Sequence, residues 1–228
     1  MEENLFMNIK IVENLNNLKN KEKLLEDQNL LNLIDLCLKK HLSIYDYLSI
    51  KDYFYLTSVN EYKNHFNDSK EFYTNINNSK IIYKLFKEWK PYEHYNLGEL
   101  RGNFLELLFY TILNNFYSNT IFRESIIYLN DYKSHTWDII MKYKKIYYLY
   151  DFKFSSQSIK RSQINQMVGL NNRAKIFKMF LIFFESHDKI WDKLHELKYD
   201  THFLKYNNML KVFNIISLED FADNNIFN

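Results

Sequence analysis

Two neighbouring segments of the chain, 137–143 and 146–154, are predicted strands with charged side chains on one face. Because side chains alternate along a strand, Asp151 and Lys153 share a face, and Asp138 lies on the corresponding face of the preceding strand. A two-residue connection, Lys144-Lys145, places Asp138 directly opposite Asp151. A four-residue connection keeps the same facing and moves the pair by one diagonal step. Opposed carboxylates destabilise a sheet, so we expect a hard divalent cation with oxygen ligands at this position.

Lys153 adds a second chemical group to this predicted site. An ammonium two residues from Asp151 can orient a nucleophilic water and offset the negative charge that develops on a phosphate. Two carboxylates, an amine and a cation together meet the requirements of phosphodiester hydrolysis. An Asp-x-Lys sequence in a strand is more often a surface ion pair. Here the surrounding sequence, YYLYDFKFS, is so apolar that both faces of the strand should be covered. Burying charged groups in such a strand costs free energy, so their presence indicates a function.

The composition narrows the classes of protein to consider. The 228 residues include three glycines, one proline and one cysteine, beside 19 tyrosines and 19 phenylalanines. The glycines are too few for a Walker loop or a dinucleotide-binding turn, and the seven histidines lack the paired spacing of a zinc site. His135, three residues before Asp138, is interpreted as a loop residue. Asn, Lys, Ile, Tyr and Phe, which have AT-rich codons, dominate the composition, and this bias indicates an AT-rich genome of bacterial, phage or plasmid-borne origin.

Cys37 lies in an apolar helical pattern, which favours a buried structural thiol and a reducing compartment. No apolar run approaches the ~18 residues of a membrane span, and the first residues lack the apolar core of a secretory signal. We therefore expect a cytoplasmic protein with no membrane contact. The formal net charge is only +2, but the segment 152–184 holds six Lys or Arg residues and no acid. This local excess predicts a polyanionic partner.

The hydrophobic periodicity divides the chain near its only proline, Pro91. Residues 1–95 are predicted to be a helical N-terminal region, with helices over 22–40, 43–55, 57–74 and 78–89. Residues 96–228 are predicted to contain both helices and strands. The predicted helices span 97–116, 160–175 and 188–197, and a last helix follows Ser217. The predicted strands span 120–129, 137–143, 146–154, 179–185 and 211–216. The predicted class is α/β, a mixed central sheet flanked by helices and preceded by the helical region.

Four segments after Pro91 resemble, in order, the motifs of the PD-(D/E)xK nuclease superfamily, which has the restriction-endonuclease-like fold. Arg101–Glu106 (RGNFLE) is similar to the family's first helix, and Thr136–Ile140 (TWDII) to the strand that bears the first metal aspartate. Asp151–Lys153 (DFK) is similar to the (D/E)xK element. Gln163–Gln166 (QINQ) resembles the QxxQ of the following helix.

The resemblance covers about 97–221, most of the chain after Pro91, and departs from the family pattern at two positions. Trp137 stands in place of the name-giving proline, and Asp151 stands where the family often has glutamate. The resemblance implies that residues 96–228 form a nuclease core. It also implies a Mg²⁺-dependent endonuclease that hydrolyses phosphodiester bonds, with Mn²⁺ as a substitute ion.

The resemblance also assigns roles to individual residues. The metal ligands that it implies are Glu106, Asp138, Asp151 and the backbone carbonyl of Phe152. Lys153 then positions the attacking water, and Gln163 supports the substrate backbone. Glu99 lies on the same helical stripe as Glu106, and the spacing alone leaves it as the alternative ligand.

Nucleic acid is the expected partner. Amides and cations on the predicted helix 160–175 suit phosphate oxygens and sugar edges, which position a substrate without reading its sequence. An ordinary solvated helix face is the alternative. The residues assigned to nucleic-acid binding are Lys160, Arg161, Gln166, Arg173 and Arg101. DNA is favoured over RNA as the substrate, in restriction, mobile-element processing or defence.

Two alternatives stay open. An RNA endonuclease of the same fold would use the same residues, because nothing in the sequence separates recognition of the 2′-OH from its absence. An inactive nuclease fold could serve as a binding or assembly subunit, although all four catalytic positions are retained. The helical N-terminal region is predicted to choose the substrate or to contact a protein partner through a surface with Tyr45, Tyr47, Tyr53 and Tyr55. A homodimer is expected if the substrate is duplex DNA.

Overall fold

The computed structural model describes residues 8–39, 42–70, 76–117, 120–199 and 212–222. The strands in these ranges are β1 (Ile9–Glu13), β2 (Ile121–Leu129), β3 (Tyr132–Tyr143), β4 (Ile146–Lys153), β5 (Phe177–Phe183) and β6 (Phe213–Ile216). The α-helices are α1 (Leu15–Glu22), α2 (Gln28–Lys39), α3 (Ile44–Tyr53), α4 (Val59–Asp68), α5 (Ile76–Trp89), α6 (Pro91–His94), α7 (Leu97–Tyr117), α8 (Arg161–Arg173), α9 (His187–Tyr199) and α11 (Leu218–Ala222). Short 3-10 turns lie at η1 (Lys23–Glu26) and η4 (Ser156–Ser158).

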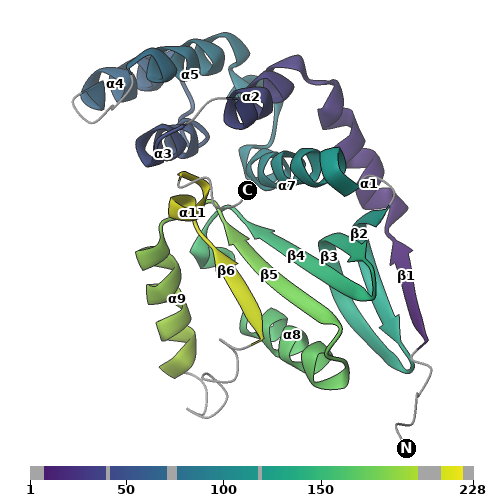
Figure 1. Cartoon of the computed structure of the whole chain (residues 1–228). Coiled ribbons are helices and arrows are strands. Elements are labelled where there is room, and N and C mark those ends of the chain that lie inside the picture. The colour runs from purple at the N-terminus through teal and green to yellow at the C-terminus, as the bar shows by residue number, and fades with distance from the viewer. Residues whose placement is uncertain (1–7, 40–41, 71–75, 118–119, 200–211, 223–228) are drawn as a thin grey trace, which may run out of the picture.

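The protein is α/β, with a six-stranded mixed sheet flanked by helices (Figure 1). The strand order in the sheet follows the sequence from β1 to β6. The first four strands pair antiparallel with their neighbours, whereas β4, β5 and β6 run parallel. A parallel return needs a connection long enough to cross the sheet, and α8 and α9 lie in these two connections.

Different helices cover the two faces of the sheet. Tyr150 and Phe152 of β4 pack into a cluster with α7, where the ring centroids of Phe109 and Phe152 lie 5.1 Å apart. The alternate β4 residues Tyr147 and Leu149 pack into a second cluster with α8 and α9. This period of two is the alternation of a strand that is covered on both sides.

Helices α2 to α5 form the helical N-terminal region, which lies beyond one end of the sheet (Figure 1). Their apolar side chains join the cluster that α7 makes with the sheet, and Leu33, Ile50 and Phe86 are fully buried in it. The hydrophobic cluster is therefore continuous across position 95. Cys37 is buried in the same cluster, which confirms its predicted place.

Every helix and strand predicted after Pro91 is present in the described ranges, with shifted ends. The helix before Pro91 ends at Trp89, as predicted. One strand is longer than predicted: β3 begins at Tyr132, so His135 lies in a strand and its interpretation as a loop residue is wrong. Positions 40, 71–74 and 211, which the predicted elements include, lie outside the described residues.

The region predicted as helical, residues 1–95, also contains a strand that was not predicted. Ile9–Glu13 forms β1, which pairs with β2 at the edge of the sheet. A five-residue strand is too short to show a clear hydrophobic periodicity. It is stabilised by pairing with β2, which lies more than a hundred residues away in the sequence. The predicted tyrosine surface is also wrong in part. Tyr47 and Tyr53 are buried, whereas Tyr45 and Tyr55 are exposed.

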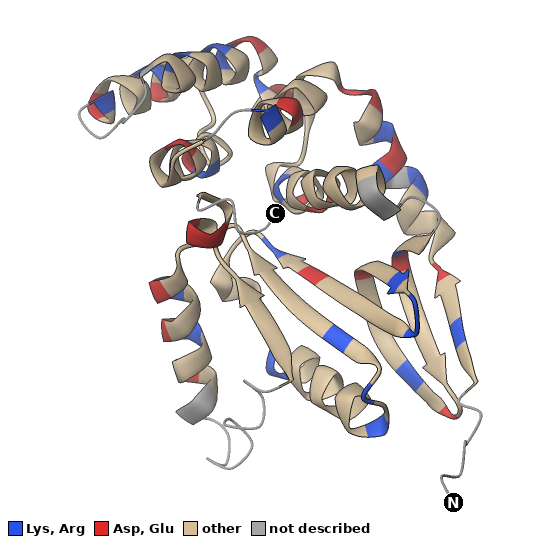
Figure 2. Ribbon diagram, in the orientation of Figure 1, with Lys and Arg blue, Asp and Glu red and all other residues tan. Residues whose placement is uncertain are grey.

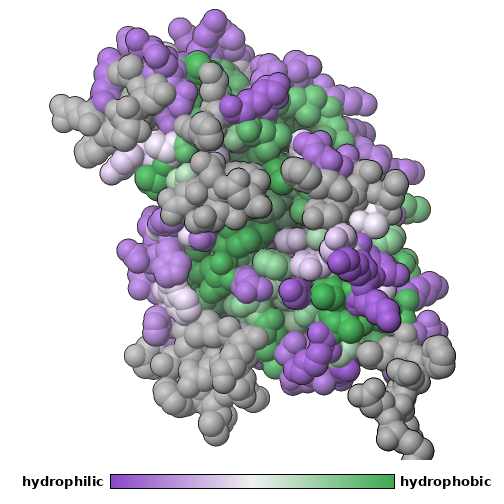
Figure 3. Space-filling view, viewed as in Figure 1, coloured by the Kyte–Doolittle hydropathy of each residue, from purple (hydrophilic) through white to green (hydrophobic). Residues whose placement is uncertain are grey.

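The surface shows mixed charge and one apolar hollow. Figure 2 shows acidic and basic segments interleaved on the N-terminal helices and on α9. Figure 3 shows apolar residues gathered across the middle of the same view. A hollow of about 300 Å³ is lined mainly by apolar side chains, among them Phe109, Tyr150, Phe180 and Ile216. No helix in the described ranges is both long and apolar enough to cross a membrane.

Candidate metal centre

The β3–β4 hairpin has the two-residue connection predicted from the sequence. Its ladder runs without a shift from the turn to the pair Ile139 and Tyr150. Lys144 in the turn has a φ of 55°, the left-handed conformation that tight hairpin turns need. The register therefore brings Asp138 opposite Asp151, one position beyond the last paired residues.

Asp138 acts as a hydrogen-bond partner where the backbone ladder between β3 and β4 ends. Its Oδ2 accepts a hydrogen bond of 2.7 Å from the backbone N–H of Phe152. Burial raises the pKa of Asp138 well above its ordinary value, and the charges of Glu106 and Asp151 raise it further. A cation beside these carboxylates would lower that pKa again, because an opposite charge favours the ionised form.

Asp151 lies between the side chains of Lys153 and His135. The Lys153 ammonium pairs with its Oδ1 and lies 3.3 Å from the backbone carbonyl oxygen of Phe152. On the other side, His135 Nε2 lies 3.4 Å from Oδ2, close enough for an ion pair but without hydrogen-bond geometry. Burial alone would raise the pKa of Asp151, but His135 and Lys153 outweigh it and hold that pKa below its ordinary value.

Glu106 reaches the strands from α7. Burial raises the pKa of its carboxyl, although the ammonium of Lys21 opposes the shift. Glu99, the alternative ligand on the same helix, is exposed near the helix start, where Asn96 Oδ1 accepts a 3.2 Å hydrogen bond from its backbone N–H. The structure thus brings Glu106, and not Glu99, to the strand carboxylates.

Glu124 on β2 is a further strand carboxylate that the sequence analysis does not include. The residues on either side of it pair with Ile139 and Trp137, so Glu124 lies opposite Asp138. Its side chain is only 6% exposed. Its φ of 45° is in the left-handed region, which costs about 1–2 kcal/mol for a residue with a Cβ. Backbone strain of this kind concentrates at functional sites.

Lys21 on α1 is the second residue that the sequence analysis misses. Its ammonium pairs with both Glu106 and Glu124, and its side chain is 14% exposed. The same helix supplies Asn17, whose Nδ2 donates a 2.9 Å hydrogen bond to Glu124 Oε2. Burial by itself lowers the pKa of Lys21, but the surrounding carboxylates outweigh it and raise that pKa above its ordinary value.

These groups fit a hard divalent cation. One carboxylate oxygen from each of Glu106, Glu124 and Asp138 lies within 4.8 Å of the others. Oxygen ligands of this type suit Mg²⁺ and Mn²⁺. Asp151 is adjacent to this group, and its charge acts on Asp138. Asp151 is 2% exposed, yet its Oδ2 accepts no hydrogen bond from the described residues. A cation would offset the cost of that buried, unsatisfied oxygen.

The residues assigned to nucleic-acid binding lie in two places. Lys160, Arg161 and Gln166 are exposed at or near the start of α8, and Gln163 beside them is half-buried. Among the described residues, no hydrogen bond joins the Gln163 side chain to the carboxylates. The other two residues are engaged within the protein. The Arg173 guanidinium lies 4.1 Å from the Tyr132 ring centroid, and that of Arg101 lies 4.2 Å from the Tyr55 ring centroid.

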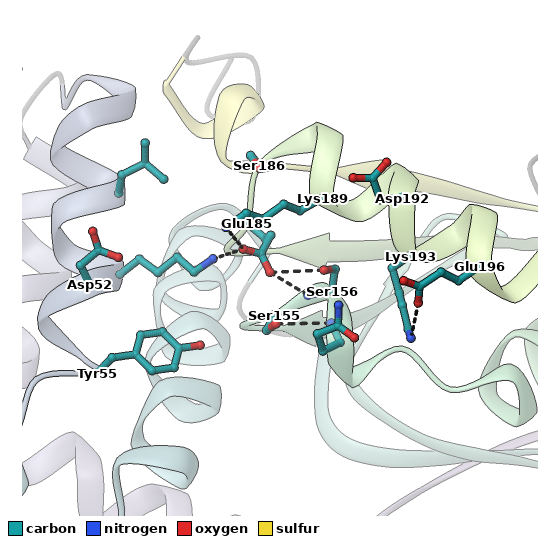
Figure 4. Close-up of a pocket in the computed structure, with 13 residues that line it drawn as sticks. Asp52, Tyr55, Ser155, Ser156, Glu185, Ser186, Lys189, Asp192, Lys193 and Glu196 are labelled. Carbon is teal, nitrogen blue, oxygen red and sulfur yellow. Dashed lines mark hydrogen bonds and ion pairs between the residues drawn. The ribbon is translucent and has the colours of Figure 1, made fainter.

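A separate cavity of about 560 Å³ opens between α3, α9 and the segment after β4 (Figure 4). Glu185 lies at its centre, where it pairs with Lys51 and accepts a 3.0 Å hydrogen bond from the Ser156 backbone N–H. The lining contains three lysines and four acids, and each of the lysines pairs with an acid. Such a lining has no excess of positive charge that would bind a polyanion. The cavity is also separate from the cluster of Glu106, Glu124, Asp138 and Asp151, none of which lines it.

No protein-family model matches the sequence, and no curated protein matches it.

Proposed function

We propose that this protein is a metal-dependent nuclease of the PD-(D/E)xK type, with a restriction-endonuclease-like core and Mg²⁺ or Mn²⁺ as its ion. An endonuclease acting on DNA is the favoured form. The four matching segments lie in α7, β3, β4 and α8, a helix, two adjacent paired strands and the next helix, which supports this core. The reaction is hydrolysis: water adds to phosphorus, and the bond from phosphorus to the leaving sugar oxygen breaks.

The observation that carries the proposal is the convergence of four acidic side chains from four elements. Glu106 comes from α7, while Glu124, Asp138 and Asp151 come from three neighbouring strands. Acidic side chains repel one another at such distances, and burial increases that cost. A protein that only needed a stable sheet would gain by replacing them with apolar residues. A polyanion-cleaving centre needs them, because they bind the ion that the phosphate must approach.

Each residue has a role that follows from its position. Glu106, Asp138 and Asp151 would hold the ion, with Glu124 beside them, and the ion would supply an activated water and neutralise charge on the phosphate. The Lys153 ammonium, beside Asp151 and the Phe152 carbonyl, is placed to orient the water and to offset charge on the phosphate. Asp138 also holds the Phe152 amide, which keeps the strand end in place.

The test is cleavage of duplex DNA, single-stranded DNA and RNA with Mg²⁺, Mn²⁺ or EDTA. We expect metal-dependent internal cleavage of at least one substrate. Lys153→Met and Asp151→Asn should each lower the rate at least about 100-fold, because each removes a group needed in the transition state. Lys142→Met is the matched control, since Lys142 lies on the neighbouring strand of the same hairpin and is exposed.

Three outcomes would overturn the assignment. They are cleavage that persists in EDTA, wild-type rates in both site variants, or the same loss of rate in Lys142→Met as in Lys153→Met. Cleavage of RNA with no cleavage of DNA would keep the site assignment and replace the favoured substrate.

A further inference from the structure

The carboxylate cluster already holds a cation, the ammonium of Lys21. That group pairs with Glu106 and Glu124, two of the three residues whose oxygens lie within 4.8 Å of one another. A cation bound by the same oxygens would lie within a few ångströms of the ammonium. At such a separation two positive charges repel strongly in a buried setting. The ammonium and a divalent ion therefore compete for the oxygens of Glu106 and Glu124.

Lys21 is held in this position by the start of the chain. Strand β1 runs along β2 as far as the pair Glu13 and Ser125. The chain then turns into α1, and the Asn14 backbone N–H donates a 2.8 Å hydrogen bond to the carbonyl oxygen of Glu124. Asn17 also donates to the Glu124 side chain. These two hydrogen bonds hold helix α1 against Glu124, and this position of the helix brings the Lys21 ammonium to Glu106 and Glu124.

On the proposed function, we infer that Glu124 belongs to the metal site and that Lys21 is an internal counter-ion, which a divalent ion must displace from Glu106 and Glu124. Asp151 Oδ2 points independently to a ligand, because it is buried and accepts no hydrogen bond from the described residues, with His135 Nε2 no nearer than 3.4 Å. Metal binding and the docked position of α1 then compete. The ammonium of Lys21 partly neutralises Glu106 and Glu124 when no ion is bound.

The test measures Mn²⁺ binding by calorimetry, without nucleic acid, for the wild type, Lys21→Met and Lys19→Met. Methionine keeps the length and apolar stem of lysine and removes the charge. We expect Lys21→Met to bind Mn²⁺ at least about tenfold more tightly than the wild type, because no ammonium competes for the carboxylates. Lys19 is exposed on the same helix, so Lys19→Met should bind like the wild type.

A second measurement uses the wild type and does not depend on how the variant folds. Amide hydrogen exchange of residues 14–22 should become faster at saturating Mn²⁺, because displacement of Lys21 loosens α1. Exchange of β3 and β4 should become slower in the same sample. Unchanged or slower exchange of residues 14–22 would overturn the inference, whatever the variant does.

The outcomes separate this inference from the proposed function. If the wild type binds Mn²⁺ and Lys21→Met binds it equally or more weakly, Lys21 is a permanent constituent of the site and the competition is absent. The nuclease proposal then stands. If neither the wild type nor Lys21→Met binds Mn²⁺, the metal site itself is absent, and the proposed function fails together with the inference.

Discussion

The Oδ2 of Asp138 lies 2.7 Å from the backbone nitrogen of Phe152, so a carboxylate closes the gap where two strands stop pairing. The contact ties a residue of β3 to the strand that bears Asp151 and Lys153. It also explains why a buried acid is tolerated at this point: part of its hydrogen-bonding capacity is satisfied by the backbone. The carboxylate therefore has a structural role beside its proposed chemical one.

The two roles of Asp138 are separable by substitution. Asp138→Asn keeps a side-chain oxygen for the Phe152 N–H and removes a negative charge from a buried acidic group. We expect the variant to be more stable than the wild type by about 1 kcal/mol in EDTA, because the repulsion from Glu106 and Asp151 is gone. Asp138→Ala should be less stable by about 1–3 kcal/mol, since it leaves a buried N–H without a partner. Urea unfolding in EDTA measures both, and equal stability of the two variants would contradict this account.

Divalent ions should stabilise the protein through the cluster. An ion that binds only the folded state adds ~2.7 kcal/mol at a concentration of one hundred times its Kd. Mg²⁺ or Mn²⁺ should therefore raise the melting temperature of the wild type, whereas Glu106→Gln should abolish most of the increase. Glu99→Gln is the matched control on the same helix, and it should respond like the wild type because Glu99 is exposed. Equal responses of the two variants would exclude Glu106 as a ligand.

The buried pair of Lys51 and Glu185 should matter for stability, since it joins α3 to the end of β5. Lys51→Met removes the closest cation and leaves Glu185 with the Ser156 backbone N–H at 3.0 Å and Lys189 at 3.7 Å. These remaining partners reduce the usual cost of breaking a buried pair, so we expect a loss of about 2–4 kcal/mol in urea unfolding.

The control for that pair is Lys39→Met, which breaks the exposed pair of Lys39 with Asp35 on α2. The side chains of this pair are 72% and 52% exposed, and such a pair contributes less than about 1 kcal/mol. A loss of similar size in the two variants would mean that burial does not strengthen the Lys51–Glu185 pair.

His65 should make the protein less stable in mild acid. Burial against Tyr53 lowers the pKa of His65 below its ordinary value of 6.5. As the pH falls below 6.5, the unfolded chain takes up a proton at His65 before the folded chain does, so the free energy of unfolding decreases. The decrease stops once the pH is below the folded pKa. Chemical unfolding of the wild type and His65→Gln between pH 8 and 5 isolates this effect.

The wild type should lose stability relative to His65→Gln as the pH is lowered from 7. Other titrating groups contribute to both proteins, so only the difference between the curves reports His65. A difference that is constant over the whole range would show that the pKa of His65 is the same in the folded and unfolded chains.

The hairpin that carries Asp138, Asp151 and Lys153 was predictable because its information is local. A two-residue turn between two apolar strands defines the register, and alternation then determines which side chains share a face. Glu106 was predictable from the resemblance of its segment, since helical spacing alone left Glu99 equally placed. The sequence by itself thus determined the order of the elements over residues 96–228, the facing of the hairpin and the acidic pair across it.

Glu124 depended on an irregularity that no local pattern reveals. The tight turn pairs Leu129 with Tyr132, and that register without a shift would place Glu124 opposite Trp137. A register shift between Ile126 and Tyr128 moves Glu124 opposite Asp138 instead. A slip of one residue exchanges the faces of a strand, so this single irregularity decides whether Glu124 joins the acidic group.

Lys21 was decided by tertiary structure alone. It lies 85 residues from Glu106 and 103 residues from Glu124 in the sequence, on a helix with no distinguishing pattern. Only the pairing of β1 with β2 brings that helix to the carboxylates. Local spacing determines which chemical groups an element presents and on which face, because backbone geometry repeats at short range. The identity of the distant cation that pairs with the buried carboxylates depends on how the elements pack. Only the tertiary structure brings such a cation close enough to offset the repulsion among the acids.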